Sequence, residues 1–413
     1  MVARMLSSFF ESRLAPFKNI NFTLFFIVRT VALIGRWSHD LARSWLILEL
    51  TGGSSWQGAV MLAAAIPITL LILKGGALVD RADAKKIMIV TQMMMGTLVL
   101  CLAAFCEWGS VTVWHLIVFA AIEGVIVSFD SPTFQALVVR IVDKEDFQQA
   151  MAINSTKFHM GRMLGPVIAG ALLTFWGPSL VFLVDAIGFF SVCIVVKFLK
   201  IRPHKQKNIK PQKLSDLRYF FQKPKMRYQL GQLALSMVTI FPLFVVVLRT
   251  FATKKFDLDA ADFGKLFMFP AMGSVLGSLM FAMWKPVNPL SAVKLGIPLI
   301  LFFYWMVLDI PTQAGAALVM CAMGFSGYLM FAALTVGIQL DVDESFRGRV
   351  SALIGLSFGS LGPIATYPIG IFADQFGESL AIRVFATAFF ILSCVWYAVH
   401  RDVFKKHDLE VEE

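Results

Sequence analysis

Apolar runs of about 20 residues recur along this chain, separated by short polar breaks. Each run is long enough to cross a hydrocarbon core of roughly 30 Å as a helix, and lipid leaves the backbone no hydrogen-bond partner outside the helix itself. With 58% hydrophobic and 15% charged residues, the chain lies outside the range of water-soluble domains. We therefore expect an all-α integral membrane protein. Twelve spans are predicted, and they begin near residues 20, 56, 86, 111, 148, 178, 228, 261, 290, 312, 347 and 379.

The distribution of charge predicts the orientation. The net charge is +10, and eleven Lys or Arg against a single acid fall between Lys197 and Arg227, after the sixth span. Basic residues gather on the cytoplasmic side of membrane proteins, which places both termini in the cytoplasm and excludes nucleic acid as a partner. The first 18 residues lack a cleavage pattern, so we expect no removable signal peptide. The five cysteines show no metal-ligand spacing and predict neither a disulfide nor a metal site.

Short words of sequence recur at a fixed offset. Trp176-Gly-Pro-Ser-Leu180 returns as Phe376-Gly-Glu-Ser-Leu380, and Val142-Asp143 returns as Val342-Asp343, both at an offset of 200 residues. Leu-Gly-Pro at 164–166 returns at 361–363, which implies a small deletion. Chance matches between glycine-containing words are the alternative, and the shared offset argues against them.

The repeat predicts two six-helix halves made on one plan. We expect an N-terminal cytoplasmic segment at 1–18, a first half at 19–199, a basic cytoplasmic linker at 200–226, a second half at 227–400 and a cytoplasmic tail at 401–413. Parallel repeats of this kind place a substrate site near the bilayer midplane, between the halves.

Several motifs resemble a known family. Gly76-x-x-x-Asp80-Arg81 with Lys85-Lys86, in the loop after the second span, is similar to the loop signature of the major facilitator superfamily. The segments at 45–54, 131–142, 161–170 and 347–353 resemble the bacterial branch that includes the enterobactin exporter and macrolide efflux proteins. The resemblance runs along most of the chain and implies the major facilitator fold and a transport function. It says little about the substrate.

The loop signature implies a conformational latch, a contact that ties the first half to the eleventh span. An acid is stabilised beside a helix N-terminus, and the eleventh span begins on the same side of the membrane as Asp80. A solvated loop that only fixes the topology is the alternative. The second half has no acid in its equivalent loop at 283–286, so the latch is expected to be one-sided. Its predicted residues are Gly76, Asp80, Arg81, Arg347, Gly348 and Arg349. Gly76 is expected to let the second span approach a neighbouring helix closely.

The first span carries Arg36, His39, Asp40 and Arg43. The spacing places Arg36, Asp40 and Arg43 on one helical face, which we expect to point inward. Charges inside a span cost roughly 2.5–3.5 kcal/mol on insertion scales, so each is a candidate for the substrate or proton pathway. For Asp40, an internal ion pair is an equal alternative. A metal site at His39 and Asp40 is not favoured, because two ligands fall short of a transition-metal set.

The fourth and fifth spans add further candidates. Glu123 and Asp130 lie two turns apart, and we favour Glu123 as the proton carrier; Asp130 has the alternative of bonding backbone groups freed at Pro132. On the fifth span, His159 and Arg162 are pathway candidates. Lys157 beside them is expected to snorkel to the cytoplasmic edge. The segment Gly161, Gly165, Pro166 and Gly170 resembles the antiporter motif and predicts close helix packing.

Together these observations predict a secondary transporter that works by alternating access. We expect proton-coupled export of an amphipathic, partly anionic organic compound, such as a siderophore or drug, by a monomer in the bacterial inner membrane. Lysophospholipid transport, metal-ion export and a non-transporting receptor or scaffold are the alternatives. No nucleotide loop or nucleophile motif is present in the sequence, so neither an enzyme nor a cofactor is expected.

Overall fold

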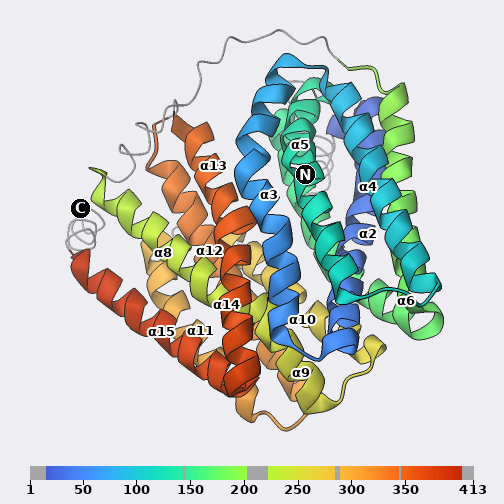
Figure 1. Cartoon of the computed structure of the whole chain (residues 1–413). Coiled ribbons are helices and arrows are strands. Elements are labelled where there is room, and N and C mark those ends of the chain that lie inside the picture. Colours follow the sequence, from blue (N-terminus) through green and yellow to red (C-terminus); the bar gives the residue numbers. More distant parts are fainter. Residues whose placement is uncertain (1–14, 143–145, 202–221, 284–288, 344–345, 402–413) are drawn as a thin grey trace, which may run out of the picture. The chain divides into compact units, whose positions relative to one another are not determined.

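The computed structural model describes residues 15–142, 146–201, 222–283, 289–343 and 346–401. Within these ranges the chain is helical and contains no strand. Most of the predicted N-terminal segment, linker and tail lie outside the described residues. The predicted all-α fold is confirmed (Figure 1).

The first half is built from five long helices. A 3₁₀ turn, η1 (Ala15–Lys18), precedes them. The helices are α2 (Ile20–Thr51), α3 (Ser54–Arg81), α4 (Ala84–Glu107), α5 (Val113–Ile141) and α6 (Phe147–Phe198). Asp83 caps α4, where its side chain accepts a hydrogen bond from the Lys85 backbone N–H at 3.0 Å. Asp83 thus marks the end of the loop after the second span and the start of α4.

Helix α6 comprises two predicted spans. Its 52 residues are interrupted at Gly177, whose φ of 76° and ψ of −177° are open essentially to glycine alone. Gly161, before the kink, packs on Leu33 of α2, whereas Gly188, after it, packs on the adjacent Ala32. Two positions 27 residues apart reach the same turn of α2 only if the two parts of α6 run side by side.

The second half contains the remaining helices. They are α8 (Pro224–Pro242), α9 (Leu248–Phe256), α10 (Ala260–Met283), α11 (Pro289–Asp309), α12 (Gln313–Leu340), α13 (Arg347–Leu356), α14 (Gly362–Phe376) and α15 (Glu378–Val399). Two π-helical turns, η3 (Leu243–Val247) and η5 (Ser357–Leu361), join α8 to α9 and α13 to α14. Such turns are frequent at functional sites.

Among the described residues, eleven helices are long and apolar enough to cross a membrane. One of these, Met160–Phe198, contains the kink at Gly177, so the predicted twelve spans account for all of them. The repeat is also visible in the backbone. Gly177 and Gly377, the equivalent glycines of the two repeated words, both have positive φ, at 76° and 92°. Each marks the same turn between consecutive spans.

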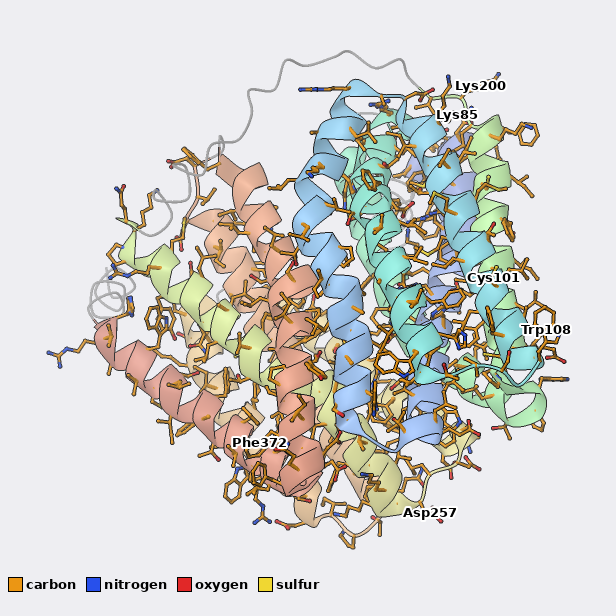
Figure 2. All side chains as sticks on the ribbon, viewed as in Figure 1. Lys85, Cys101, Trp108, Lys200, Asp257 and Phe372 are labelled. Atoms are coloured by element: carbon orange, nitrogen blue, oxygen red, sulfur yellow. The ribbon has the colours of Figure 1, made fainter. Side chains whose placement is uncertain are left out.

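The chain divides into two compact units that cut across the two halves. Unit 1 comprises Met1–Leu46, Ile66–Asn208 and Ala260–Lys265, and unit 2 comprises Ile47–Ala65, Ile209–Asp259 and Leu266–Glu413. In unit 1, α4 packs on both α5 and α6. Lys85 and Lys200 lie at one end of this unit and Trp108 at the other (Figure 2). In unit 2, α8 packs on α14 and α15, and α11 packs on α12.

The kink at Gly177 predicts a sensitive substitution. Gly177→Ala forces a side chain into a backbone conformation that costs about 1–3 kcal/mol, so we expect a lower thermal unfolding midpoint for the purified protein in detergent. Gly355→Ala is the matched control, because Gly355 is helical and has open space around it. Equal midpoints for the two variants would contradict this account of the turn.

Candidate functional site

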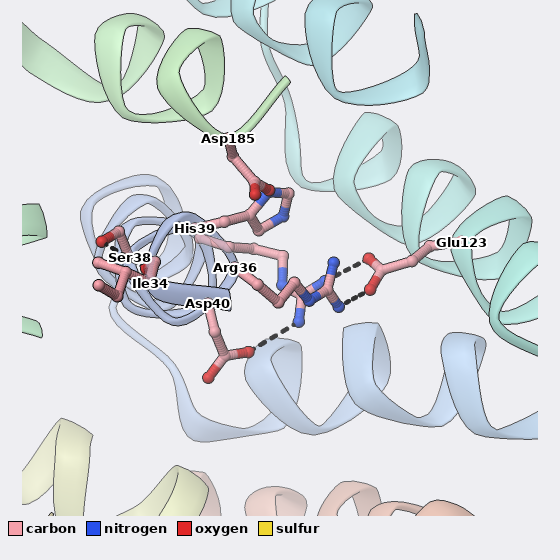
Figure 3. Close-up of polar contacts among 8 residues, drawn as sticks. Ile34, Arg36, Ser38, His39, Asp40, Glu123 and Asp185 are labelled. Carbon is pink, nitrogen blue, oxygen red and sulfur yellow. Dashed lines mark hydrogen bonds and ion pairs between the residues drawn. The ribbon is translucent and has the colours of Figure 1, made fainter. Parts of the chain in front are cut away.

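The charged residues of α2 converge on a single carboxylate of α5. The guanidinium of Arg36 forms an ion pair with Glu123, and Arg43 Nη1 lies 2.9 Å from Glu123 Oε2 (Figure 3). Arg43 Nη2 also lies 3.0 Å from Asp40 Oδ1, within α2. The predicted inward face of Arg36, Asp40 and Arg43 is therefore the face that meets α5. Glu123 is held by two cations.

His39 points to a different helix. Its Nδ1 lies 2.9 Å from Oδ2 of Asp185, in the part of α6 that follows the kink (Figure 3). Both side chains are buried, with 3% and 0% of their surfaces exposed. Sequence analysis did not select Asp185. The sequence nevertheless marks this residue, because a lone acid within the apolar segment 181–190 is a functional candidate by default.

These six side chains form one site, which we call the ion cluster. Its members are Arg36, His39, Asp40, Arg43, Glu123 and Asp185. Two guanidiniums face three carboxylates, so the cluster carries a net charge of −1 when every carboxylate is ionised and the imidazole is neutral. One bound proton makes it neutral. All six residues belong to unit 1.

The cluster is graded in exposure. Arg36 and Asp40 expose 30% and 33% of their side chains, whereas Arg43 and Glu123 expose 12% and 8%. A small cavity of about 10 Å³ adjoins the inner part, which is room for about one water molecule. Its lining includes His39, Arg43 and Glu123, with apolar side chains from α4 and α5 around them. The cavity suits water and is too small for an organic compound.

A second polar group lies elsewhere in unit 1. Asp130 Oδ1 accepts hydrogen bonds from Thr91 Oγ1 at 2.8 Å and Gln92 Nε2 at 2.7 Å, both on α4. The predicted alternative for Asp130, bonds to backbone groups near Pro132, is not what the described residues show. Lys157 also departs from expectation. It does not snorkel but is buried, with its ammonium over the ring of Phe134.

The glycines of the antiporter-like segment pack tightly. A Cβ on Gly165 would collide with Trp37 of α2, and the Gly165 carbonyl accepts a hydrogen bond from Ser38 Oγ at 3.0 Å. A Cβ on Gly170 would lie 2.9 Å from the Ala260 carbonyl, at the start of α10. The carbonyl of Pro166 blocks a Cβ on Gly264 in the same way. These residues bring α6 close to α2 and to the first turn of α10.

The remaining predicted pathway and latch residues lie outside the ion cluster or outside the described residues. Arg162 is half-buried, and the side chain of His159 lies outside the described residues. Arg81 is exposed. The side chains of Asp80, Arg347 and Arg349, and the surroundings of Gly348, also lie outside the described residues, so the cytoplasmic latch stays a prediction.

The prediction for Gly76 needs correction. A Cβ at Gly76 would meet nothing within 4 Å, whereas a Cβ at Gly75 would collide with the carbonyl of Ser128 on α5. Successive residues of a helix point about 100° apart, and it is the preceding glycine that faces α5. Gly75 therefore makes the close approach that we expected of Gly76.

A carboxylate bound to a helix N-terminus does occur within unit 2. Asp374, near the end of α14, accepts hydrogen bonds from the backbone N–H groups of Ser54 at 2.7 Å and Ser55 at 2.9 Å, in the first turn of α3. Two glycines let the backbones approach, since a Cβ on Gly58 would lie 2.6 Å from the Thr366 carbonyl and one on Gly370 would lie 2.7 Å from the Ser54 carbonyl. Sequence analysis missed this contact, whose partners are 320 residues apart.

Helical spans around a buried ion cluster are typical of a membrane transporter, and comparison with known proteins shows which kind. A family model described as transmembrane secretion effector matches residues 11–413. The chain therefore belongs to this family of major facilitator superfamily transporters, which are multi-pass membrane proteins. The predicted resemblance is confirmed.

Relatives extend over nearly the whole chain. It is 23% identical to the staphyloferrin A transporter of Staphylococcus aureus, over 94% of this chain and 98% of that protein. It is 21% identical to macrolide efflux protein A of Streptococcus pyogenes, over 84% of this chain and 88% of that protein. The crystal structure of the nucleoside transporter NupG superposes with a TM-score of 0.71 at 15% identity, over 92% of this chain and 99% of that chain. The last similarity supports the fold alone.

Removal of the shared carboxylate tests the ion cluster. Glu123→Gln leaves two guanidiniums without their common partner, and breaking a buried ion pair costs about 3–5 kcal/mol. We expect a large drop in the thermal unfolding midpoint, partly restored in the double variant Glu123→Gln/Arg36→Gln. The exposed Glu107→Gln is the control. Additive losses in the double variant would show that the two side chains do not act together.

The cap on α3 makes a separate prediction. Asp374→Ala removes a carboxylate that serves two backbone N–H groups, and loss of a helix cap costs about 0.5–2 kcal/mol. The unfolding midpoint is expected to fall below that of Asp309→Ala, which removes an exposed acid paired with Arg383 at 3.6 Å. The account of the cap fails if the two variants unfold together.

Proposed function

We propose that this protein is a proton-driven exporter of an amphipathic organic compound, a siderophore or drug, which works by alternating access. The ion cluster carries the proposal. A net charge of −1 deep within membrane-spanning helices is costly unless a counter-charge arrives, and a proton is the smallest one available. The sequence has no ATP-binding motif, so an ion gradient is the remaining source of energy.

The class of cargo rests on the relatives and on Arg36. The two relatives described above are named for staphyloferrin A and for macrolides. Arg36 is one of the two partly exposed members of the cluster, with 30% of its side chain exposed. A partly exposed guanidinium offers a charge-assisted hydrogen bond to an acidic or carbonyl group of the cargo. This supports a partly anionic compound.

The proposal also covers the orientation of the protein in the membrane and its oligomeric state. We propose that both termini lie in the cytoplasm of a bacterial cell, with the spans in the inner membrane, and the basic loops and linker support this orientation. We propose a monomer and no enzymatic activity. The rival cargo of a metal ion is less favoured, because no group of three His, Cys, Asp or Glu side chains suited to a metal forms among the described residues.

Proton-coupled export is testable in everted membrane vesicles. An imposed inward-acidic gradient quenches acridine orange, and addition of enterobactin or erythromycin to vesicles that contain the protein is expected to release protons and restore fluorescence. Arg36→Gln should weaken this response, and Asp309→Ala should leave it unchanged. Vesicles without the protein give the background.

Two results would overturn the proposal. Uptake of an organic compound without proton movement removes the coupling. A response to lysophosphatidylcholine or Zn²⁺ in place of every organic compound in the panel reassigns the cargo.

A further inference from the structure

Asp185 differs from the other carboxylates of the ion cluster. Glu123 and Asp40 are both bound by arginines. The hydrogen-bond partner of Asp185 among the described residues is the imidazole of His39, which, unlike a guanidinium, can be neutral. Its Oδ2 lies 2.9 Å from His39 Nδ1, and its Oδ1 has no hydrogen-bond partner. An ionised carboxylate normally accepts two or more hydrogen bonds. Asp185 therefore has too few hydrogen-bond donors to stabilise a permanent negative charge.

Asp185 is enclosed by protein. The side chain is fully buried, and its Oδ1 faces the backbone of α2 at Gly35, where a Cβ would lie only 3.1 Å away. The ring of Phe182 packs edge-on against His39 at 4.8 Å. Burial of a charge in such a place is expensive, and neutralisation by a proton is the usual solution.

The charged groups that face the pair come from two helices. On α2 they are Arg36 and Arg43, which act over a distance and do not contact Asp185, together with Asp40, which Arg43 binds. On α5 the charged group is Glu123, already held by both arginines. At the cavity, α4 contributes apolar side chains from residues 98, 99 and 102. Since the arginines are matched by Glu123 and Asp40, Asp185 is the carboxylate left over.

We propose that Asp185 and His39 form the binding site of the coupling proton, with His39 as the relay. The inference rests on the proposed function and names the residues that perform it. Glu123, which sequence analysis favoured as proton carrier, instead holds the two arginines in place. The cavity beside His39, with room for about one water molecule, is also lined by Arg43 and Glu123 and joins the pair to the inner part of the ion cluster.

The proton count balances in each state. In the empty state His39 carries its proton on Nδ1 and donates it to the Asp185 carboxylate. A proton from the cavity water binds His39 Nε2, and the Nδ1 proton passes to Asp185. In the loaded state Asp185 is a neutral acid that donates to the bare Nδ1, and His39 is again neutral. Release runs through the same steps in reverse.

Loading changes how α2 and α6 meet. Asp185 lies against Gly35. Three residues further along α6, Gly188 packs on Ala32, and a Cβ on Gly188 would lie only 3.2 Å from the Ala32 Cα. The proton therefore enters at a close contact between α2 and the later part of α6. A change in the charge of Asp185 alters the energy of this contact, which gives the proton a route to the packing of unit 1.

Infrared difference spectroscopy on the purified, reconstituted protein tests the site without a substrate. A pH titration is expected to show one protonated-carboxyl band that appears on acidification in the wild type. Asp185→Asn should abolish the band, because the amide mimics the loaded state. Asp130→Asn is the control, a half-buried carboxylate with hydroxyl and amide partners, and should retain it. A band that persists in Asp185→Asn, or its absence from the wild type, overturns the proposal.

A second variant covers failure of Asp185→Asn to fold. Gly35→Ala places a methyl group against Asp185 Oδ1 without removing the acid, and is expected to shift the midpoint of the same band. An unshifted midpoint, in a variant whose thermal unfolding shows that it is folded, counts against the site.

The vesicle assay separates the two levels of the proposal. If enterobactin or erythromycin moves protons in wild-type vesicles, Asp185→Asn should retain exchange of the compound across the membrane but lose proton movement. Proton movement that survives in Asp185→Asn rejects the proton site and leaves the export function standing. A titrating Asp185 band in a protein that moves none of the compounds has the opposite meaning: the proton site holds and the proposed cargo is wrong.

Discussion

The interaction on which the rest of unit 1 depends is the ion pair of Glu123 with Arg36 and Arg43. Inside a bilayer these two guanidiniums need carboxylate partners; Asp40 of the same span contacts Arg43, and the carboxylate that both share comes from another span. Glu123 supplies it and thereby fixes the rotation of α2 relative to α5. Once α2 is fixed, His39 faces α6, and Asp185 meets it there.

Glycines supply the second constraint, because ion pairs of this length require closely spaced helices. Gly35 and Gly188 let α2 approach the later part of α6, and Gly165 does the same for the earlier part. The kink at Gly177 lets both parts of α6 pack on α2. Charge pairing and glycine packing therefore favour the same arrangement of α2, α5 and α6. A change to either would alter the geometry of the Asp185–His39 pair.

The sequence predicted local features well. Apolar run length predicted the spans, and the word at 176–180, which recurs in altered form at 376–380, contains the turn at Gly177. Both follow from residues near each other in the chain. Helical spacing placed Arg36, Asp40 and Arg43 on one face, and the cost of buried charge singled out Glu123.

Features that depend on contacts between distant segments were missed. Asp185 was passed over because it stands alone, and its partner His39 lies 146 residues away. Asp374 gave no sign that it caps a helix 320 residues earlier. The choice between Gly75 and Gly76 depended on which face of α3 meets α5, a fact of packing that an isolated loop signature does not contain.

The central proposal is that the ion cluster binds one proton, at Asp185 and His39, and releases it when the cargo binds. Its most direct test is a count of protons released into weakly buffered solution, with a pH-sensitive dye, when purified protein binds a compound that it exports. The account predicts release of about one proton per protein molecule, and none from the Asp185→Asn variant, which still binds the compound. Binding to the wild type without any proton release would contradict it.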